Sequence, residues 1–360
     1  MSILGGRIAS ISGISKDLEF LGGGVSDRYR VEETAFESES AVLLSDVETG
    51  TEACILPGIG ANCIAFRARR DGNSFPLLFE PPDPGVLRNR PSGFGIPILF
   101  PFPNRVEEGR FTYGNRSFEI SKPQGQPHAI HGFVMGRPWQ QAAIRARDDI
   151  GAMLRCEFRS ADYPELESQY PSTFEAASIF RLRDGVLWVT LEGVNTGNEP
   201  MPAGIGFHPY FPLPMLESGD REVCTVHLPA RSIWPLRDDC IPTGSLSSVA
   251  GDNDLRNPRK LGDLTYDDVW SQVTYHEGWS RSTYRDPEAG VSVYVDADES
   301  FRELVLYAPD TRPVVCIEPY TCTTNALNLD ASGTDAGLVH LAPGEKIRGV
   351  MRITAMLEQT

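Results

Sequence analysis

The sequence predicts an all-β protein with antiparallel sheets. Short apolar runs recur along most of the chain, and turn residues separate them, with 34 Gly and 28 Pro spread evenly over 360 residues. Frequent turns between short apolar runs are typical of antiparallel sheets. Helical periodicity is scarce, and the chain shows no repeat, low-complexity tract or linker. We therefore expect residues 29–360 to form one large β domain, because β-sandwiches and barrels often run long as single units.

Residues 1–28 are rich in Gly and Ser and have weak periodicity, so we interpret them as an N-terminal extension. The strand pattern begins at Tyr29. The triplets Glu48-Thr49-Gly50 and Asp71-Gly72-Asn73 are hairpin signals between short apolar runs. The first strands after Tyr29 are expected at residues 41–44, 52–56, 61–67 and 74–80.

The clearest hairpin runs from Thr173 to Val194, with a tight turn at Asp184-Gly185. Before the turn, the residues on one face are Phe174, Ala176, Ser178, Phe180 and Leu182, and after it Leu187, Val189 and Leu191 alternate with Trp188, Thr190 and Glu192. Residues 255–264 are the one stretch where we expect a helical turn, limited by Pro258 and Gly262.

Composition excludes several classes of partner. Apolar residues make up 41% and charged residues 23%, as in ordinary soluble proteins. The formal net charge of −16 argues against nucleic acid and anionic membrane surfaces as partners. We expect no signal peptide in residues 1–15 and no membrane span, since no run of eighteen apolar residues occurs.

The seven cysteines are odd in number and scattered, and no CxxC motif occurs. This pattern favours reduced thiols in a cytoplasmic protein over a disulfide framework or a zinc site.

One histidine stands out in the stretch Gly204 to Leu213. His208 lies between Phe207 and Pro209, and the proline stiffens its backbone. A titratable imidazole held in this way suits a general acid or base near neutral pH. The alternative is a structural histidine in a turn at a strand end.

Three further stretches place polar residues among Gly, Pro and aromatics. Asn104-Arg105 follows three prolines, and Arg105 either binds a substrate or forms a surface ion pair. His128 and His131 are three apart, which puts them on opposite faces of a strand, and no third ligand is adjacent, so we predict no metal there. Asp267 lies either in a solvated turn or in a binding site.

Glu318 is embedded in the apolar sequence Val-Val-Cys-Ile-Glu-Pro-Tyr. A glutamate in such a strand is costly to bury unless it has partners or a function. The alternative is an edge-strand glutamate that faces water.

Five of these motifs, in this order, resemble the aldose 1-epimerase (galactose mutarotase) family. They are Asn104-Arg105, His131-Gly132, His208-Pro209-Tyr210-Phe211, Asp267 followed by Trp270, and Glu318-Pro319. The likeness runs from about Tyr29 to Leu357. It implies a large antiparallel β-sandwich with an open, polar sugar cleft. It also implies interconversion of the α and β anomers of an aldose, with no metal or other cofactor.

Carried over position by position, Glu318 resembles the catalytic base of the family and His208 its acid. Ring opening needs a proton taken from the C1 hydroxyl and one given to the ring oxygen, which a carboxylate and an imidazolium can do. The residues expected to bind the sugar are Asn104, Arg105, His131, Arg137, Tyr210 and Asp267. The aromatics that could stack on it are Phe102, Trp139, Phe207 and Tyr210.

The sequence also departs from the galactose-type pattern. His131-Gly132-Phe133, with Arg137 nearby, is similar to the glucose-6-phosphate 1-epimerase branch. Arg88, Arg90, Arg105 and Arg137 would form a phosphate site if they converge. A non-catalytic sugar-binding protein on the same scaffold is a third hypothesis. The preferred sugar, the oligomeric state (monomer or homodimer) and the job of residues 1–28 stay open.

Overall fold

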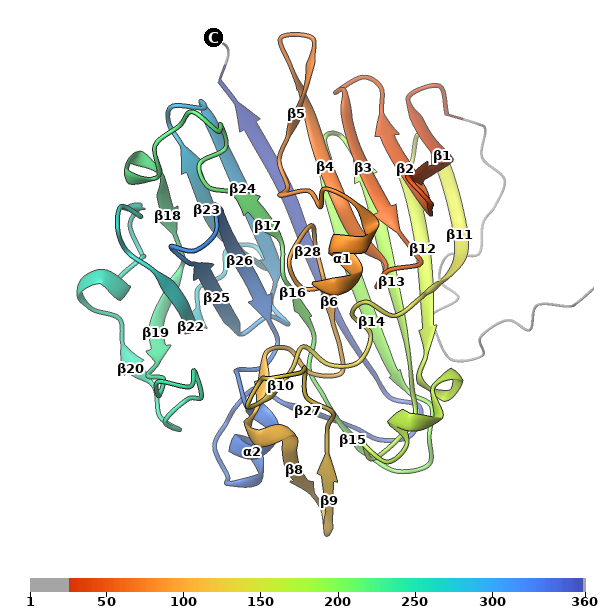
Figure 1. The fold of residues 1–360 in the computed structure, drawn as a ribbon, viewed down its shortest axis with the longest axis vertical. Helices are drawn as coiled ribbons and strands as arrows, with labels where there is room; N and C mark the ends of the chain where they lie inside the picture. Colours follow the sequence, from red (N-terminus) through yellow and green to blue (C-terminus); the bar gives the residue numbers. More distant parts are fainter. Residues whose placement is uncertain (1–25, 359–360) are drawn as a thin grey trace, which may run out of the picture.

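The computed structural model describes residues 26–358 and confirms the prediction of an all-β protein with antiparallel sheets (Figure 1). Most of the predicted N-terminal extension, residues 1–25, lies outside the described residues. Ser26 is fixed by a hydrogen bond from its hydroxyl to Asp148, and Arg28 donates to the carboxylate of Asp46. No helix within residues 26–358 has the length and apolarity needed to cross a membrane.

A five-stranded sheet contains the N-terminal strands in sequence order. Its strands are β1 (Tyr29–Phe36), β2 (Glu39–Asp46), β3 (Thr51–Leu56), β4 (Asn62–Arg70) and β5 (Asn73–Pro76). The four strands expected between residues 41 and 80 are present, although β5 ends at Pro76, before the predicted end at residue 80. Asp71 and Gly72 have φ values of 51° and 81°, as the tight turn between β4 and β5 requires.

A nine-stranded sheet packs against the five-stranded one. In spatial order its strands are β11 (Gln140–Arg147), β12 (Gly151–Arg159), β13 (Phe174–Arg183), β14 (Val186–Asn195), β28 (Lys346–Leu357), β24 (Val291–Asp298), β23 (Trp279–Asp286), β18 (Thr225–His227) and β21 (Arg259–Lys260). The hairpin predicted at residues 173–194 is confirmed as β13 and β14. Burial alternates along most of β13 and at the start of β14, where Phe180 and Val189 are buried and Trp188 is partly exposed, whereas β14 is buried throughout from Val189 to Asn195.

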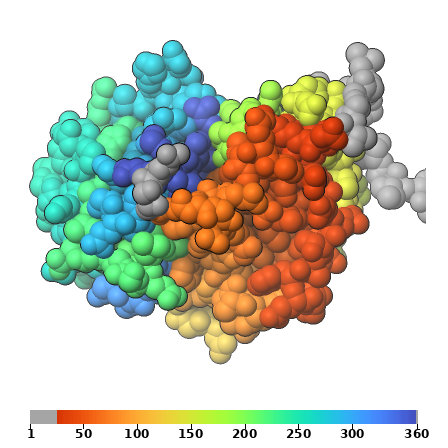
Figure 2. Space-filling view, turned by 90° about the horizontal axis from the view of Figure 1, so that it is seen from above, coloured from red at the N-terminus to blue at the C-terminus, as the bar shows by residue number. Residues whose placement is uncertain are grey.

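A third sheet has eight strands. Its strands are β20 (Ser247–Ser248), β19 (Ala230–Trp234), β22 (Tyr266–Val273), β25 (Glu303–Ala308), β26 (Val314–Tyr320), β16 (Gly206–Phe207) and β6 (Ile98–Leu99), with β17 (Tyr210–Pro212) also paired to β26. In Figure 2 the N-terminal strands, in red and orange, lie beside later parts of the chain, in green to blue.

Short elements connect these sheets. The two-stranded pairs are β7 (Arg105–Val106) with β10 (Ala129–Ile130), β8 (Arg110–Tyr113) with β9 (Arg116–Glu119), and β15 (Met201–Ala203) with β27 (Val339–Leu341). The helices are α1 (Pro84–Asn89), α2 (Ala326–Ala331) and the 3-10 turns η1 (Glu107–Gly109), η2 (Ser160–Asp162), η3 (Pro164–Leu166), η4 (Arg221–Val223) and η5 (Gly251–Asn253). The helical turn expected in residues 255–264 is wrong, because that stretch contains β21.

Candidate active site

The strand register brings His208 and Glu318 together. β16 pairs Gly206 with Tyr320, and β17 pairs Tyr210 with Cys316, both antiparallel. Counting between these two pairs places His208 directly opposite Glu318 at the break between β16 and β17. Pro209 and Pro319 have no N–H to donate at that point, so the backbone ladder is interrupted there. The distance from His208 Nε2 to Glu318 Oε1 is 3.4 Å.

Neighbouring strands place more polar residues on the same face. Asp267 is opposite Tyr307, Tyr307 is opposite Cys316, and Val305 is opposite Glu318. Because side chains two apart in a strand share a face, Tyr320 also points to this side. The Tyr320 hydroxyl donates a hydrogen bond to Glu318 Oε2. Three adjacent strands therefore supply one continuous wall.

A second wall comes from the chain around β7 and β10. Asn104 and His131 flank the paired residues of this short ribbon and have positive φ values of 55° and 65°. They hold each other: the Asn104 N–H donates to His131 Nδ1 at 3.3 Å, and the His131 N–H donates to the Asn104 carbonyl at 2.9 Å. Non-glycine residues with positive φ concentrate at functional sites. Gly132 is required next to His131, since a Cβ there would lie 2.1 Å from the Phe100 carbonyl oxygen.

Arg105 joins the two walls. Its Nη1 donates to the side chain of Asn104 at 3.2 Å, and its Nη2 donates to Asp267 Oδ2 at 2.9 Å. Between the walls lies a cavity of about 150 Å³. The residues that line it are Arg90, Ser92, Asn104, Arg105, Ile130, His131, His208, Tyr210, Asp267, Val305, Tyr307, Glu318 and Tyr320.

Burial sets the proton positions in the cavity. It lowers the pKa of His131 to about 3, with a further contribution from the Arg105 charge. His131 is therefore neutral, and because its Nδ1 accepts the Asn104 N–H, its proton is on Nε2. A neutral imidazole of this kind can donate a hydrogen bond to a ligand oxygen.

Burial favours the uncharged forms of both His208 and Glu318. Burial lowers the pKa of His208 well below its usual value, and the neighbouring His131 adds to this effect. Burial also raises the pKa of Glu318 well above its usual value, against the hydrogen bond from Tyr320. Both effects favour uncharged groups, so a carboxyl and a neutral imidazole face each other at 3.4 Å. Moving the proton to His208 gives a carboxylate and an imidazolium.

Tyr210 packs against the imidazole of His208, and Arg312 in turn packs against Tyr210. The Tyr210 ring stacks on His208 at 4.5 Å between centroids, and its hydroxyl lies 3.2 Å from Nε2. The guanidinium of Arg312 lies over Phe79, Phe94 and Tyr210, at 5.5, 5.4 and 5.3 Å from the ring centroids.

Comparison with known proteins identifies the family. A sequence profile of the aldose 1-epimerases matches residues 46–354. The chain belongs to the aldose 1-epimerase family. YphB of Escherichia coli (strain K12), an uncharacterized protein, is 33% identical over 116 residues, which are 32% of this chain and 36% of YphB. Galactose mutarotase of Bos taurus is 28% identical over 179 residues, 49% of each chain. The aligned regions thus span about a third and a half of these relatives.

Solved structures of this family share the fold. A galactose mutarotase-like protein from Clostridium acetobutylicum superimposes with a TM-score of 0.82 at 22% sequence identity, over 92% of this chain and 100% of the other. The predicted large antiparallel β-sandwich is therefore confirmed.

Seven of the eight predicted site residues line the cavity: Asn104, Arg105, His131, His208, Tyr210, Asp267 and Glu318. Arg137 does not. Its Nε donates to the Phe133 carbonyl, and its Nη2 pairs with Glu165 at 3.2 Å. Its assignment as a sugar-binding residue stays a prediction, although its side chain lies outside the cavity lining.

The predicted arginine cluster and the stacking aromatics are only partly present. Of the four arginines, Arg90 and Arg105 line the cavity, whereas Arg88 pairs with Glu39 at 2.7 Å. Phe102, Trp139 and Phe207 are buried in the core and do not line the cavity. His128 accepts a hydrogen bond from the Glu108 N–H, whereas His131 accepts one from the Asn104 N–H. The two histidines therefore have different partners.

The sequence interpretation missed several lining residues. Tyr307 and Tyr320 are predictable from period 2, since each lies two residues from a lining position on a strand. Arg90 and Ser92 follow α1 in a loop, and only the tertiary structure places that loop at the cavity.

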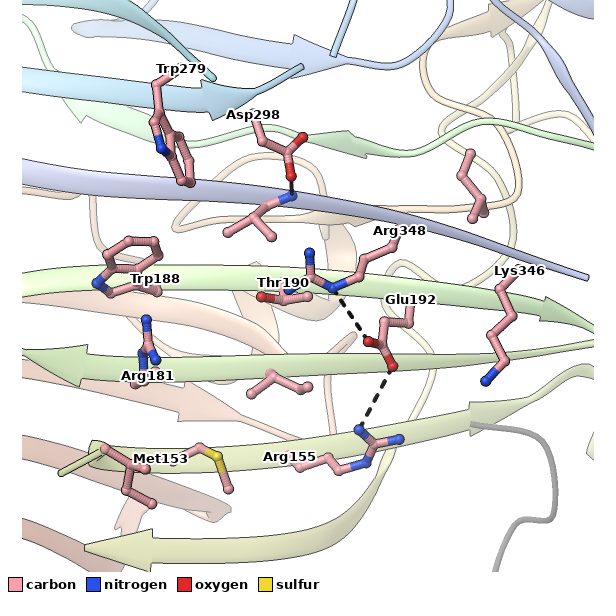
Figure 3. A pocket seen from close by; sticks show the side chains of 14 residues that line it. Met153, Arg155, Arg181, Trp188, Thr190, Glu192, Trp279, Asp298, Lys346 and Arg348 are labelled. Atoms are coloured by element: carbon pink, nitrogen blue, oxygen red, sulfur yellow. Dashed lines mark hydrogen bonds and ion pairs between the residues drawn. The ribbon is translucent and has the colours of Figure 1, made fainter. Parts of the chain in front are cut away.

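A larger hollow lies on the outer face of the nine-stranded sheet (Figure 3). It measures about 750 Å³ and contains none of the predicted site residues. Glu192 lies between Arg155 and Arg348, at 4.0 and 3.4 Å. Asp298 accepts a hydrogen bond from the Val350 N–H. The carboxylates of Glu192 and Asp298 are therefore paired with groups of the sheet itself. We take the smaller cavity as the candidate active site.

Proposed function

We propose that the protein is an aldose 1-epimerase that interconverts the α and β anomers of a free hexose. The observation that carries this proposal is the buried His208–Glu318 pair, whose Nε2 and Oε1 atoms lie 3.4 Å apart at the wall of a polar cavity. Membership of the aldose 1-epimerase family and the relatedness to bovine galactose mutarotase support the same reaction.

In the proposed reaction, Glu318 takes the proton of the C1 hydroxyl while His208 donates a proton to the ring oxygen. The C1–O5 bond breaks, and the open-chain aldehyde forms. Rotation about C1–C2 then exposes the other face of the aldehyde. As O5 attacks C1 and the ring closes, Glu318 returns its proton to O1 and His208 takes its proton back from O5. The reaction requires the ionised form of the pair. The Arg105 guanidinium favours the carboxylate form of Glu318, and hydrogen bonds from sugar hydroxyls would stabilise that carboxylate further.

The remaining lining residues have positioning roles in this proposal. His131, neutral with its proton on Nε2, donates to a sugar oxygen on which negative charge develops. Asp267 accepts from sugar hydroxyls, and Arg105 fixes Asp267 through their 2.9 Å hydrogen bond. Asn104 and Tyr210 hold the two imidazoles in place.

Glu318→Gln tests the central assignment. The amide keeps the shape of the side chain but cannot take a proton, so we expect the mutarotation rate to fall at least about 10³-fold. Polarimetry with α-D-glucose and α-D-galactose measures the rate, and thermal unfolding checks that the variant is folded. Near wild-type mutarotation by Glu318→Gln would rule out the assignment. Sugar binding without any mutarotation by the wild type would establish the non-catalytic alternative.

A phosphorylated hexose is a second candidate substrate, and one observation favours it. Within residues 26–358 the exposed side chain of Arg90, at the cavity lining, has no carboxylate partner. A free guanidinium at the mouth of a sugar site suits a phosphate.

Arg90→Ala distinguishes the two substrates. If a phosphate binds there, kcat/KM for glucose 6-phosphate falls about tenfold or more, and kcat/KM for glucose changes less than twofold. Arg88→Ala is the matched control, because Arg88 pairs with Glu39. Equal effects of Arg90→Ala on both substrates would argue against a phosphorylated substrate.

A further inference from the structure

Cys316 is a buried thiol beside the acid–base pair, and the proposed reaction does not use it. It lies two residues before Glu318 on the same face of β26 and opposite Tyr210 of β17. His208, Cys316 and Glu318 each offer one ligand atom, and these three atoms lie within 4.8 Å of one another. The exposed fractions of these residues are 5%, 0% and 1%. Within the described part of the chain, this is the one cluster of three such groups that meets that distance.

We propose that His208, Cys316 and Glu318 bind a thiophilic divalent cation such as Zn²⁺, and that the bound ion blocks the sugar cavity. Imidazole nitrogen, thiolate sulfur and carboxylate oxygen are the ligand types that zinc takes in proteins. Zinc sites that bind a substrate or water usually have three protein ligands and an open fourth position, and this cluster also supplies three ligands. His208 and Glu318 line the cavity, so an ion bound to them would lie at its wall.

The charges of the ligand set match a divalent ion in a buried place. A thiolate and a carboxylate contribute two negative charges, and neutral imidazole contributes none, so the complex with Zn²⁺ has no net charge. A neutral complex avoids the large cost of burying an isolated ion. On binding, the thiol releases its proton to solvent, and any proton held on the carboxyl is released with it.

Small side-chain movements are sufficient to form the site. Tetrahedral zinc, with ligand distances of about 2.0 to 2.3 Å, places neighbouring ligand atoms roughly 3.5 Å apart. The His208 and Glu318 atoms are already 3.4 Å apart. The thiol therefore has to approach by about 1 Å, which a rotation about its side-chain bond can supply.

The blocking effect rests on the proposed function, whereas metal binding itself does not. A cation bound to His208 and Glu318 occupies the two groups that would move protons. Mutarotation would then stop without any change in the fold.

Co²⁺ absorption tests binding independently of activity. Added to the full-length protein, Co²⁺ bound to a thiolate gives a near-ultraviolet charge-transfer band, which Zn²⁺ should displace. We expect Cys316→Ser to abolish the band. Cys240→Ser is the matched control, because the Cys240 thiol is the other one that contacts a lining carboxylate, at 3.6 Å from Asp267. A band that is absent from the wild type, that survives Cys316→Ser, or that is lost in Cys240→Ser would overturn the proposal.

Zn²⁺ titration of the mutarotation rate tests blocking. Loss of one ligand of three should raise the Zn²⁺ concentration for half-inhibition at least about tenfold in Cys316→Ser, while Mg²⁺ should not inhibit the wild type. A thiolate band accompanied by an unchanged rate would disprove blocking. A metal-free wild type with no mutarotation would count against the proposed function alone, since the band would still report binding.

Discussion

At the scale of single residues, Arg312 has the most unusual surroundings outside the cavity lining. Its Nη2 donates to the Gly93 carbonyl at 2.7 Å. Its Nη1 is buried and has no hydrogen-bond partner among the described residues. The cation instead lies among three aromatic rings, one of which is Tyr210, the ring stacked on His208. Arg312 therefore links the loop that holds Ser92 to the ring that orients the imidazole.

Removing this cation should disturb His208 without unfolding the protein. We expect Arg312→Met to lower kcat about tenfold and change KM less than threefold, since cation–π contacts contribute about 0.5 to 2 kcal/mol. Arg312→Lys should restore part of kcat because it keeps a cation over the rings. Steady-state mutarotation kinetics check both variants. If kcat of Arg312→Met equals that of the wild type, Arg312 has no positioning role.

At the scale of elements, the eight-stranded sheet buries two glutamates on one face. Glu318 on β26 lies at the cavity, whereas Glu303 on β25 does not. The Glu303 carboxyl accepts hydrogen bonds from Trp234 Nε1 and the Ser271 hydroxyl, both at 3.0 Å. Burial raises the pKa of Glu303 to about 8, and these two donors act in the opposite direction. The same strand environment thus produces one candidate catalytic group and one structural group.

The raised pKa of Glu303 predicts a pH-dependent stability. The unfolded chain releases the Glu303 proton above its usual pKa near 4.5, while the folded protein keeps it up to about pH 8. The stabilisation is fully present below pH 4.5 and is lost as the pH rises through 8.

Glu303→Gln removes this dependence, because the amide is neutral at every pH. Relative to the wild type, its free energy of unfolding should be higher by on the order of a few kcal/mol at pH 8, and the difference should shrink towards pH 5. Urea unfolding of both proteins at the two pH values measures it. The idea fails if the difference between the proteins is the same at pH 5 and pH 8.

At the scale of the whole molecule, the two hollows lie on different sheets. The larger one has Trp188 and Trp279 on its floor, with ring centroids 5.6 Å apart (Figure 3). Arg352 lies over both rings, at 5.3 and 4.2 Å, and Arg181 lies over Trp188 at 4.7 Å. These stacked contacts hold the central strands together from outside. They suit a stabilising surface, whereas the buried His208–Glu318 pair lies at the smaller cavity.

Trp188→Ala tests this division. Loss of the ring should lower the free energy of unfolding by about 1 to 3 kcal/mol. KM and kcat for mutarotation should stay within twofold of the wild type, because no residue lines both hollows. A large rise in KM for Trp188→Ala would place sugar binding at the outer face.

Local patterns were sufficient for much of the fold. Alternation along residues 173–194 predicted both strands and the buried face, because a half-buried strand repeats every two residues. The helices α1 and α2 have six residues each, too short to show helical periodicity, so they were not predicted. The helical turn predicted in residues 255–264 was wrong. This ten-residue stretch contains Pro258 and Gly262 and has little helical preference of its own, so pairing with a neighbouring strand decided its conformation.

The sequence by itself determined the chemistry: which stretches form strands, that Glu318 lies in an apolar strand, and that His208 is held beside a proline. Only the tertiary structure decided which of these groups meet. Register between distant strands put His208 opposite Glu318, and packing of β7 near β22 brought Arg105 to Asp267. The fold also placed Arg137 beside Glu165 of η3, outside the cavity lining. The physical reason is that backbone periodicity is local, whereas His208 and Glu318, like Arg105 and Asp267, are more than a hundred positions apart and meet only through the folded sheet.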